Sequence, residues 1–258
     1  MKKILIILLV IIILIIIFFV FLKEKNNIDI IVKQDKSFSI SEISIYSGAS
    51  GENVSDNYQN PEWNLNIYQY SDIAIYLKRI EEFKESNNIK KIYIDNINLG
   101  SPILGTPKLY YLNPYDYGSD NINENNEIKD KLEFNILNSD NSQNDISYSI
   151  PIAFQDLSNP ITLKYVNTDI VKSYKISNEE KMIFDGTLLK IARVNPKDIQ
   201  NTISFSINIK TDDVLYKQNV EIKIPLEDYN GTSLYNGNIK YKEILNISFW
   251  VQNISLDF

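Results

Sequence analysis

Two patterns of apolar residues divide the chain. Residues 4–22 are nineteen consecutive apolar side chains, placed between Lys2-Lys3 and Lys23-Glu24-Lys25. As a helix with about 1.5 Å per residue, this run spans roughly 28 Å, close to the hydrocarbon thickness of a bilayer. From Phe38 onward, apolar and polar residues alternate in short segments, which is typical of half-buried strands. The pattern therefore predicts one N-terminal transmembrane helix followed by an all-β body.

The apolar run predicts an uncleaved signal anchor over residues 1–28. A cleaved signal peptide usually has a shorter apolar region, of about 7–15 residues, that ends at a small-x-small site. Here the first such triplet is Ser37-Phe38-Ser39, well beyond the run, and the chain has no cysteine to carry a lipid. Lys counts on the two flanks tie, but the short N-terminal tail favours a cytoplasmic N-terminus and an extracytoplasmic body at the cell membrane. Late cleavage remains the alternative.

The alternation predicts hairpins in the second half of the chain. Residues 203–210 and 214–224 are alternating runs joined by Thr211-Asp212-Asp213, and they favour one hairpin. Asn236-Gly237 supplies the positive φ angles of a type I′ turn and indicates a second hairpin. Further strands are predicted at residues 63–67, 131–136, 161–165 and 247–251.

Two strands change phase in the same way. Phe38 and Ile40 are followed by Ile43 and Ile45, and residues 92 and 94 are followed by 97 and 99. One extra residue in a β-bulge would keep both pairs on one face, whereas the alternative is two short strands. Residues 71–84 fit either a helix or a strand over 72–77, and residues 187–192 fit one short helical turn.

Two polar, acidic stretches have almost nothing to bury, namely residues 118–129 and 138–145. The first is the best candidate for a boundary between β-rich halves or domains at residues 29–130 and 131–258. Each piece has the usual size of a sandwich domain. The predicted fold class is an antiparallel β-sandwich body, as one large sandwich or as two tandem sandwiches.

Composition excludes several chemistries. The chain has no histidine and no cysteine, which removes Ser-His-Asp and Cys-His catalysis and every His- or Cys-ligated metal. It lacks Ser-x-x-Lys and a phosphate-binding glycine loop, and no cofactor is expected. With 26 Lys and Arg against 33 Asp and Glu, the net charge is −7, which argues against nucleic acid as a partner.

Carboxylate chemistry is left. A pair of Asp or Glu side chains would suffice to hydrolyse a glycosidic bond, but 33 acidic residues make a chance pair unavoidable. The run Asp140, Ser142, Asn144, Asp145 resembles a calcium loop but lacks the glycine and glutamate of an EF-hand. A looser oxygen-rich cluster consists of Asp116, Asp120, Asn121 and Asn123. Solvated loops explain both, so the sequence predicts no enzyme and no metal site.

Tyrosines give the one positive indication of recognition. Four of them, Tyr110, Tyr111, Tyr115 and Tyr117, fall within eight residues beside a Pro/Gly loop. Tyr offers a large, rigid, amphipathic contact area and suits protein or sugar partners. Tyr is also common in strands, so a structural role is the competing interpretation.

Several segments together are familiar: residues 60–70, 91–96, 105–114, 158–165 and 184–187. With them the chain resembles a group of single-pass, β-rich surface proteins of low-GC Gram-positive bacteria, which carries no known activity. The resemblance implies a bacterial surface location. The expected function is a non-catalytic binding or structural role at the cell envelope, with the membrane contacted through residues 4–22 and an envelope protein or glycan as partner. The alternatives are a glycan-binding or glycan-hydrolysing module and an accessory subunit of a membrane complex.

Overall fold

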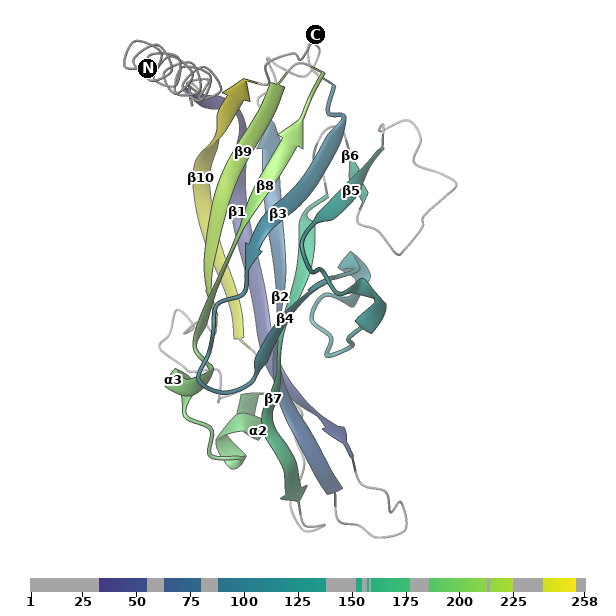
Figure 1. Ribbon diagram of the computed structural model, residues 1–258, viewed down its shortest axis with the longest axis vertical. Coiled ribbons are helices and arrows are strands. Elements are labelled where there is room, and N and C mark those ends of the chain that lie inside the picture. The colour runs from purple at the N-terminus through teal and green to yellow at the C-terminus, as the bar shows by residue number, and fades with distance from the viewer. Residues whose placement is uncertain are drawn as a thin grey trace, which may run out of the picture.

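A computed structural model describes residues 33–54, 63–79, 88–137, 152–154, 157, 159–176, 186–212, 214–224 and 239–253. The strands within these ranges are long and mostly antiparallel (Figure 1): β1 (Lys33–Asn53), β2 (Trp63–Arg79), β3 (Lys91–Asn98), β4 (Thr106–Tyr111), β5 (Leu132–Leu137), β6 (Ile152–Phe154), β7 (Ile161–Ile176), β8 (Asn201–Lys210), β9 (Val214–Ile224) and β10 (Ile239–Asn253). Four short helices accompany them: η2 (Pro114–Asp116), η3 (Glu124–Asn126), α2 (Gly186–Ile191) and α3 (Pro196–Ile199). The all-β prediction is confirmed for the part of the chain that the structure describes.

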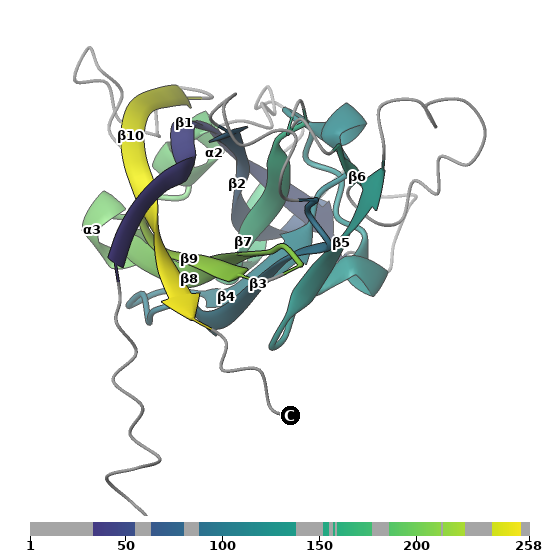
Figure 2. The same ribbon diagram turned by 90° about the horizontal axis from the view of Figure 1, so that it is seen from above.

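The ten strands form one hydrogen-bonded sheet in the order β4-β7-β2-β1-β10-β9-β8-β3-β5-β6. Among the strand pairs that the structure describes, β5–β6 is parallel and the others are antiparallel. Viewed along the strands, the sheet curls until it is nearly closed, and β1, β2 and β7 face β3, β8 and β9 across the interior (Figure 2). Strands from residues 29–130 and 131–258 are interspersed in this order, because β7 lies between β4 and β2, and β3 lies between β8 and β5. Both predicted halves therefore contribute to one sheet.

Several local predictions are confirmed. β8 and β9 pair as the predicted hairpin, with Lys210 opposite Leu215. The phase change in β1 is a bulge between Ile40 and Glu42, and it shifts the register against both β2 and β10. Residues 72–77 belong to a strand rather than a helix, and the helical turn at 187–192 is α2. The Asn236-Gly237 turn and residues 1–32 lie outside the described residues.

β3 contains the second predicted bulge. Its register against β8 shifts between Asp95 and Asn98, and Asn96 has a φ of 53°. The extra residue returns Ile97 to the face that carries Ile92 and Ile94, so all three pack on the same core. Both phase changes in the sequence are thus single bent strands, which is how a sheet of this length curls.

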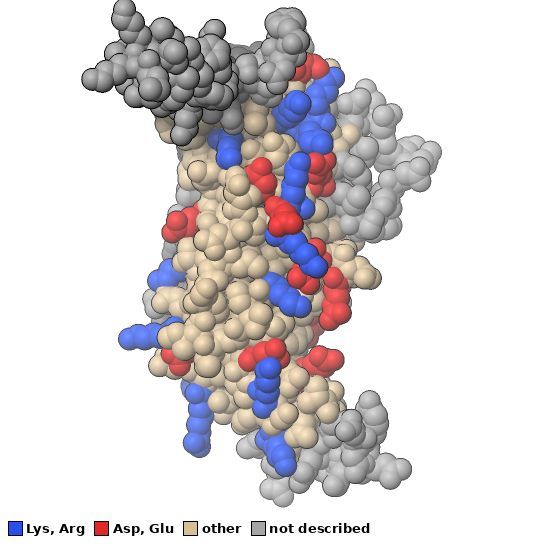
Figure 3. Space-filling model, viewed as in Figure 1, with Lys and Arg blue, Asp and Glu red and all other residues tan. Residues whose placement is uncertain are grey.

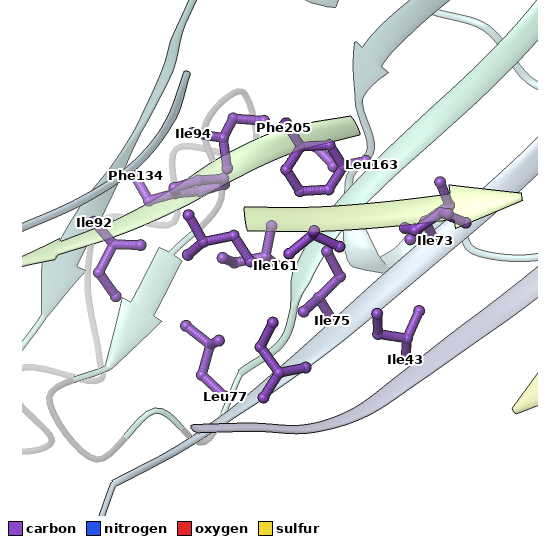
Figure 4. Close-up of a cluster of buried hydrophobic side chains, with 14 of the residues drawn as sticks. Ile43, Ile73, Ile75, Leu77, Ile92, Ile94, Phe134, Ile161, Leu163 and Phe205 are labelled. Carbon is purple, nitrogen blue, oxygen red and sulfur yellow. The ribbon is translucent and has the colours of Figure 1, made fainter. Parts of the chain in front are cut away.

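The interior holds two apolar clusters. The larger joins side chains from both walls of the curled sheet, as Figure 4 shows for Ile43, Ile73 and Leu163 from one wall and Ile92 and Phe205 from the other. A smaller cluster at the far end packs α2 and α3 against β1, β2 and β7. Burial of this much isoleucine and leucine surface, at about 25 cal/mol per Å², is the main stabilising contribution to the fold.

A polar belt separates the two clusters inside the sheet. Ser47 and Ser71, opposite each other on β1 and β2, share a hydrogen bond of 2.6 Å between their hydroxyl oxygens. Asn201 donates from its amide nitrogen to the Tyr165 hydroxyl (2.9 Å) and to the carbonyl of Leu99 (2.6 Å). These four side chains find hydrogen-bond partners inside the sheet, which offsets the cost of burying them.

Among the described residues, no helix combines the length and the apolar character needed to cross a membrane. The predicted anchor, residues 4–22, lies outside those residues.

Candidate functional site

The outer face of β7, β2 and β1 is covered by residues 112–131, called here the cover loop. On β7 every residue from Ile161 to Asn167 is buried, although the sequence alternates between apolar and polar side chains. The inner set, which includes Leu163 and Tyr165, faces the core. Lys164 and Val166 belong to the outer set, and the cover loop removes them from water. The polar stretch that was expected to be the least structured, residues 118–129, is therefore folded against the sheet.

Backbone groups hold both ends of the cover loop. The carbonyl of Leu112 accepts the Thr162 hydroxyl at 2.6 Å, and the Ile128 N–H donates to the carbonyl of Leu109 at 2.8 Å. The side-chain oxygens of Asn113 and Asn123 cap the short helices η2 and η3. Such Asn caps replace hydrogen bonds that a loop would otherwise lack, which is why an Asn-rich segment can fold without an apolar core of its own.

A buried ion pair between Asp72 and Lys164 fastens the middle of the loop. The two residues are direct partners in the register of β2 and β7, and their side chains are 0% and 2% exposed. Nζ of Lys164 lies 2.6 Å from Oδ1 of Asp72 and donates to the carbonyl of Ser119 at 2.7 Å. The Gly118 N–H donates to Oδ2 of Asp72 at 2.7 Å. Gly118 has a φ of 87°, a conformation that favours glycine, so the loop can turn its N–H toward the carboxylate.

Burial dominates the electrostatics of this pair. It raises the pKa of Asp72 despite the opposing charge of Lys164, and it lowers the pKa of Lys164 despite Asp72. Both shifts favour the uncharged form of each group, because a buried charge loses its hydration. The ring of Tyr70 lies 4.8 Å from Nζ and closes one side of the pocket around the amine.

Tyrosines surround the pair on the outer face. Rings of Tyr46 and Tyr70 have centroids 6.5 Å apart, and those of Tyr46 and Tyr117 are 6.4 Å apart. Tyr117 donates its hydroxyl to Oγ of Ser44 at 3.3 Å, and burial raises the pKa of Tyr117 to about 12. The hydroxyl thus stays protonated at neutral pH. Ring–ring contacts of this kind stabilise by about 0.5–1.5 kcal/mol beyond the area they bury.

Two neighbouring depressions lie beside the cover loop, and we call them together the outer cleft and each of them a lobe. The larger lobe has a volume of about 640 Å³ and is lined by Ser50, Gly51, Glu52, Asn66, Tyr68, Lys108, Tyr110, Asp120, Asn121, Ile122, Glu124, Thr168 and Asp169. The smaller lobe has a volume of about 340 Å³ and is lined by Tyr110, Tyr111, Leu112, Asn113, Asp116, Asn121, Asn123, Asn126 and Lys164. Tyr110 and Asn121 belong to both lobes. Volumes of roughly 300–1,000 Å³ are usual for small-ligand sites.

The lining of the outer cleft is polar and acidic. Oγ of Ser50 donates to Oδ2 of Asp120 at 2.7 Å, and Tyr68 donates to the Asp120 carbonyl at 3.3 Å. Nζ of Lys108 lies 3.7 Å from Oε2 of Glu127. Burial raises the pKa of Tyr68, so its hydroxyl remains a donor at neutral pH. Carboxylates outnumber the lysines in the larger lobe, which disfavours anionic ligands and suits neutral ones with many hydroxyl groups.

The structure separates the four tyrosines that the sequence singles out. Tyr110 and Tyr111 are buried, and both line the smaller lobe. Tyr115 is 78% exposed, and Tyr117 is half-buried over Ser44. Their role in binding stays a prediction, but they do not lie side by side on one exposed face.

The oxygen-rich residues of the sequence make other contacts. Asp116, Asn121 and Asn123 line the smaller lobe, Asp120 accepts a hydrogen bond from Ser50, and the Asn123 side chain caps η3. In the described part of the chain, no group of three or more Asp or Glu side chains is arranged to hold a metal. The run 140–145 lies outside the described residues.

Sequence reasoning missed the residues at the centre of the site, Asp72 and Lys164. Both occupy positions of the alternating pattern that predict a solvated face. Their one usable signal is opposite charge on two strands, and that becomes informative only when the register of β2 against β7 is known.

Comparison of the chain with protein-family models, with curated proteins and with solved structures finds no match.

Proposed function

We propose that this chain is a membrane-anchored, extracytoplasmic protein with a non-catalytic binding role at the cell envelope, and that its partner binds in the outer cleft. The observation that carries the proposal is the outer cleft itself, a two-lobed, tyrosine-lined depression whose wall, the cover loop, is fixed by a buried ion pair. A loop held by strong internal contacts is preorganised, so a partner loses less entropy on binding.

The anchor and the orientation are part of the proposal. Residues 4–22 are long enough to span a bilayer, and the short N-terminal tail favours a cytoplasmic N-terminus. A protease added to intact cells should then remove residues 29–258. Complete protection of these residues, with degradation after the cells are opened, would contradict the orientation.

An envelope glycan is the ligand class that the lining favours. The smaller lobe is rich in asparagine, including Asn121 and Asn126, whose amides offer donors and acceptors to hydroxyl groups. Tyr110 and Tyr111 add aromatic surface. The acidic larger lobe, with Glu124 among its carboxylates, argues against anionic polymers. The carboxyl whose pKa burial raises, Asp72, is already bonded to Lys164 and Gly118, so the proposal includes no hydrolytic step.

Site-directed crosslinking in intact cells tests the proposal. A photoreactive amino acid at position 121, which lines both lobes, should capture an envelope component, whereas the same probe at position 221, on the exposed outer face of β9, should not. Capture at both positions or at neither would reject the outer cleft as the binding surface. A membrane protein as the captured partner would favour the accessory-subunit alternative.

A binding measurement separates glycan from protein partners. The full chain, purified in detergent, should be retained on cell-wall glycan strands, and Asn121→Ala with Asn126→Ala should weaken retention about tenfold or more through lost hydrogen bonds. Glu221→Ala is the matched control and should bind as the parent does. Equal retention of all three proteins would show that the glycan contacts another surface.

A further inference from the structure

The contacts around Asp72 and Lys164 differ from those of the other ion pairs in the described residues. Lys91 with Glu133 and Lys90 with Asp212 are half exposed, and water solvates them. The Asp72–Lys164 pair is shielded by β1, β2, β7 and the cover loop, and its side chains are at most 2% exposed. A lysine amine and a carboxyl group are therefore held in contact and are almost completely shielded from solvent.

From this geometry we propose that Asp72 and Lys164 are the site of a self-catalysed intramolecular amide bond, which joins Cγ of Asp72 to Nζ of Lys164 and crosslinks β2 to β7. Nζ already lies 2.6 Å from Oδ1, the oxygen that is bonded to Cγ. The amine and the carboxyl group are therefore in contact, as the groups of a near-attack conformer are when their reacting atoms lie roughly 3–3.5 Å apart.

The groups that contact the pair supply what the condensation needs. The Ser119 carbonyl accepts one N–H of Lys164 at 2.7 Å and so orients the amine. The Gly118 N–H donates to Oδ2 at 2.7 Å, where negative charge develops when nitrogen adds to Cγ. A backbone donor in that position stabilises the tetrahedral intermediate in the manner of an oxyanion hole.

The step balances without any co-reactant. The neutral Lys164 amine adds to Cγ of the Asp72 carboxyl, whose proton is on Oδ1, and forms the C–N bond. One N–H proton passes to Oδ1, the Cγ–Oδ1 bond breaks, and Oδ1 leaves with both protons as one water molecule. Oδ2 becomes the amide oxygen and keeps its hydrogen bond from Gly118. Burial prepares the reactants, since it raises the pKa of Asp72 and lowers that of Lys164, which favours the acid and the free amine.

The product removes the two buried charges. A buried ion pair loses much of its Coulomb energy to desolvation, whereas an amide carries no net charge and makes hydrogen bonds to Gly118 and Ser119. The new bond would also close a covalent loop between residues 72 and 164. These residues lie on β2 and β7, neighbouring strands that border the outer cleft. The crosslink would thereby join the two strands permanently beneath the cover loop.

Intact-mass spectrometry of the denatured full chain tests the proposal directly. The parent should be lighter than its sequence by the mass of one water molecule. Lys164→Arg and Asp72→Ala should each have the full mass of their sequence. Comparing the parent with the two variants also cancels any modification that all three proteins share. Glu133→Gln, which alters the exposed pair with Lys91, should show the same loss of water as the parent.

Peptide mapping locates the bond. A tryptic digest of the parent should contain one branched peptide that joins the segment with Asp72 to the segment with Lys164, with no cleavage after Lys164. A parent of full mass, or a water loss that persists in Lys164→Arg, would overturn the proposal. The parent measurement decides the question even where a variant fails to fold.

Discussion

The two outer faces of the curled sheet have similar sequence patterns and different environments. On β9 the outer residues Asn219, Glu221 and Lys223 are exposed, and the residues between them are buried. On β7 the outer residues Lys164 and Val166 are as buried as the inner ones. The difference comes from the cover loop, which lies on β7, β2 and β1.

Charge distribution follows the same division. On the face that Figure 3 shows, where β3, β8 and β9 lie in front, Lys and Arg side chains are interspersed with Asp and Glu at the surface. On the β7–β2 face, opposite charges meet beneath the cover loop, as Asp72 and Lys164 do. A solvated face tolerates almost any polar residue, whereas a covered face requires each polar group to find a partner. The covered face is thus where single substitutions should have large effects.

The largest expected effect comes from removing one partner of the buried pair. Asp72→Ala removes the carboxyl partner of Lys164 at a site shielded from solvent, and breaking such a buried pair usually costs about 3–5 kcal/mol. Glu221→Ala, on the exposed outer face of β9, should change stability by less than about 0.5 kcal/mol. Urea unfolding of both variants and the parent, followed by circular dichroism, measures the difference.

Equal destabilisation of the two variants would contradict this comparison. It would mean that the cover loop does not exclude water from the β7–β2 face. Loss of the ion pair should also release the loop, because Gly118 and Ser119 lose their side-chain partners. Faster amide hydrogen exchange in residues 112–123 of Asp72→Ala, with unchanged exchange in β8 and β9, would report that release.

The sequence predicts features of this fold that depend on neighbouring residues. Alternation is local, so it identifies β8 and β9 and the hairpin between them. A change of parity is also local, so it identifies the bulges near Ile40 and Asn96. Short-range rules of this kind hold because side chains on a strand point to alternate faces.

The covering of β7 could not be predicted in this way. Nothing near Lys164 indicates that residues 112–131, about forty positions earlier, fold over it. The cover loop reads as solvated because nothing in its own sequence indicates the hydrogen bonds that it makes to β1, β2 and β7. The buried pair and the outer cleft arise from that long-range contact, so the candidate site is the least predictable part of the molecule. Tyr110 and Tyr111 are predicted from the density of tyrosines in their segment, not from the cleft that they line.

An effect of intermediate size on stability is expected from ionisation of the Tyr165 hydroxyl, on the inner side of β7. Tyr165 is fully buried, and burial raises its pKa from 10.0 to about 12. The unfolded chain releases this proton near pH 10.0, whereas the folded chain keeps it to a higher pH. The stabilisation that Tyr165 contributes is therefore fully present below pH 10.0 and is lost as the pH rises through about 12. Two pKa units correspond to about 2–3 kcal/mol.

Tyr165→Phe isolates this contribution. The variant gives up the hydrogen bond from Asn201, so it should be less stable than the parent by about 1 kcal/mol at neutral pH. Between about pH 10 and about pH 12 its stability should decline less steeply than that of the parent, because one titrating group is gone. Parallel declines in urea-unfolding free energy would show that Tyr165 ionises equally well in both states.

The smallest effect compares single hydroxyl groups on the two outer faces. Ser50, on the outer face of β1, donates to Asp120 of the cover loop at 2.7 Å. Ser50→Ala removes that bond, and Asp120 recovers water because it is exposed, so a loss of about 0.5–1.5 kcal/mol is expected. Ser204→Ala, the same exchange on the outer face of β8, should fall within about 0.5 kcal/mol of the parent. A larger loss at Ser204 than at Ser50 in urea unfolding would mean that the cover loop rests on the sheet without depending on its hydroxyl contacts, and that the ion pair beneath it carries the attachment alone.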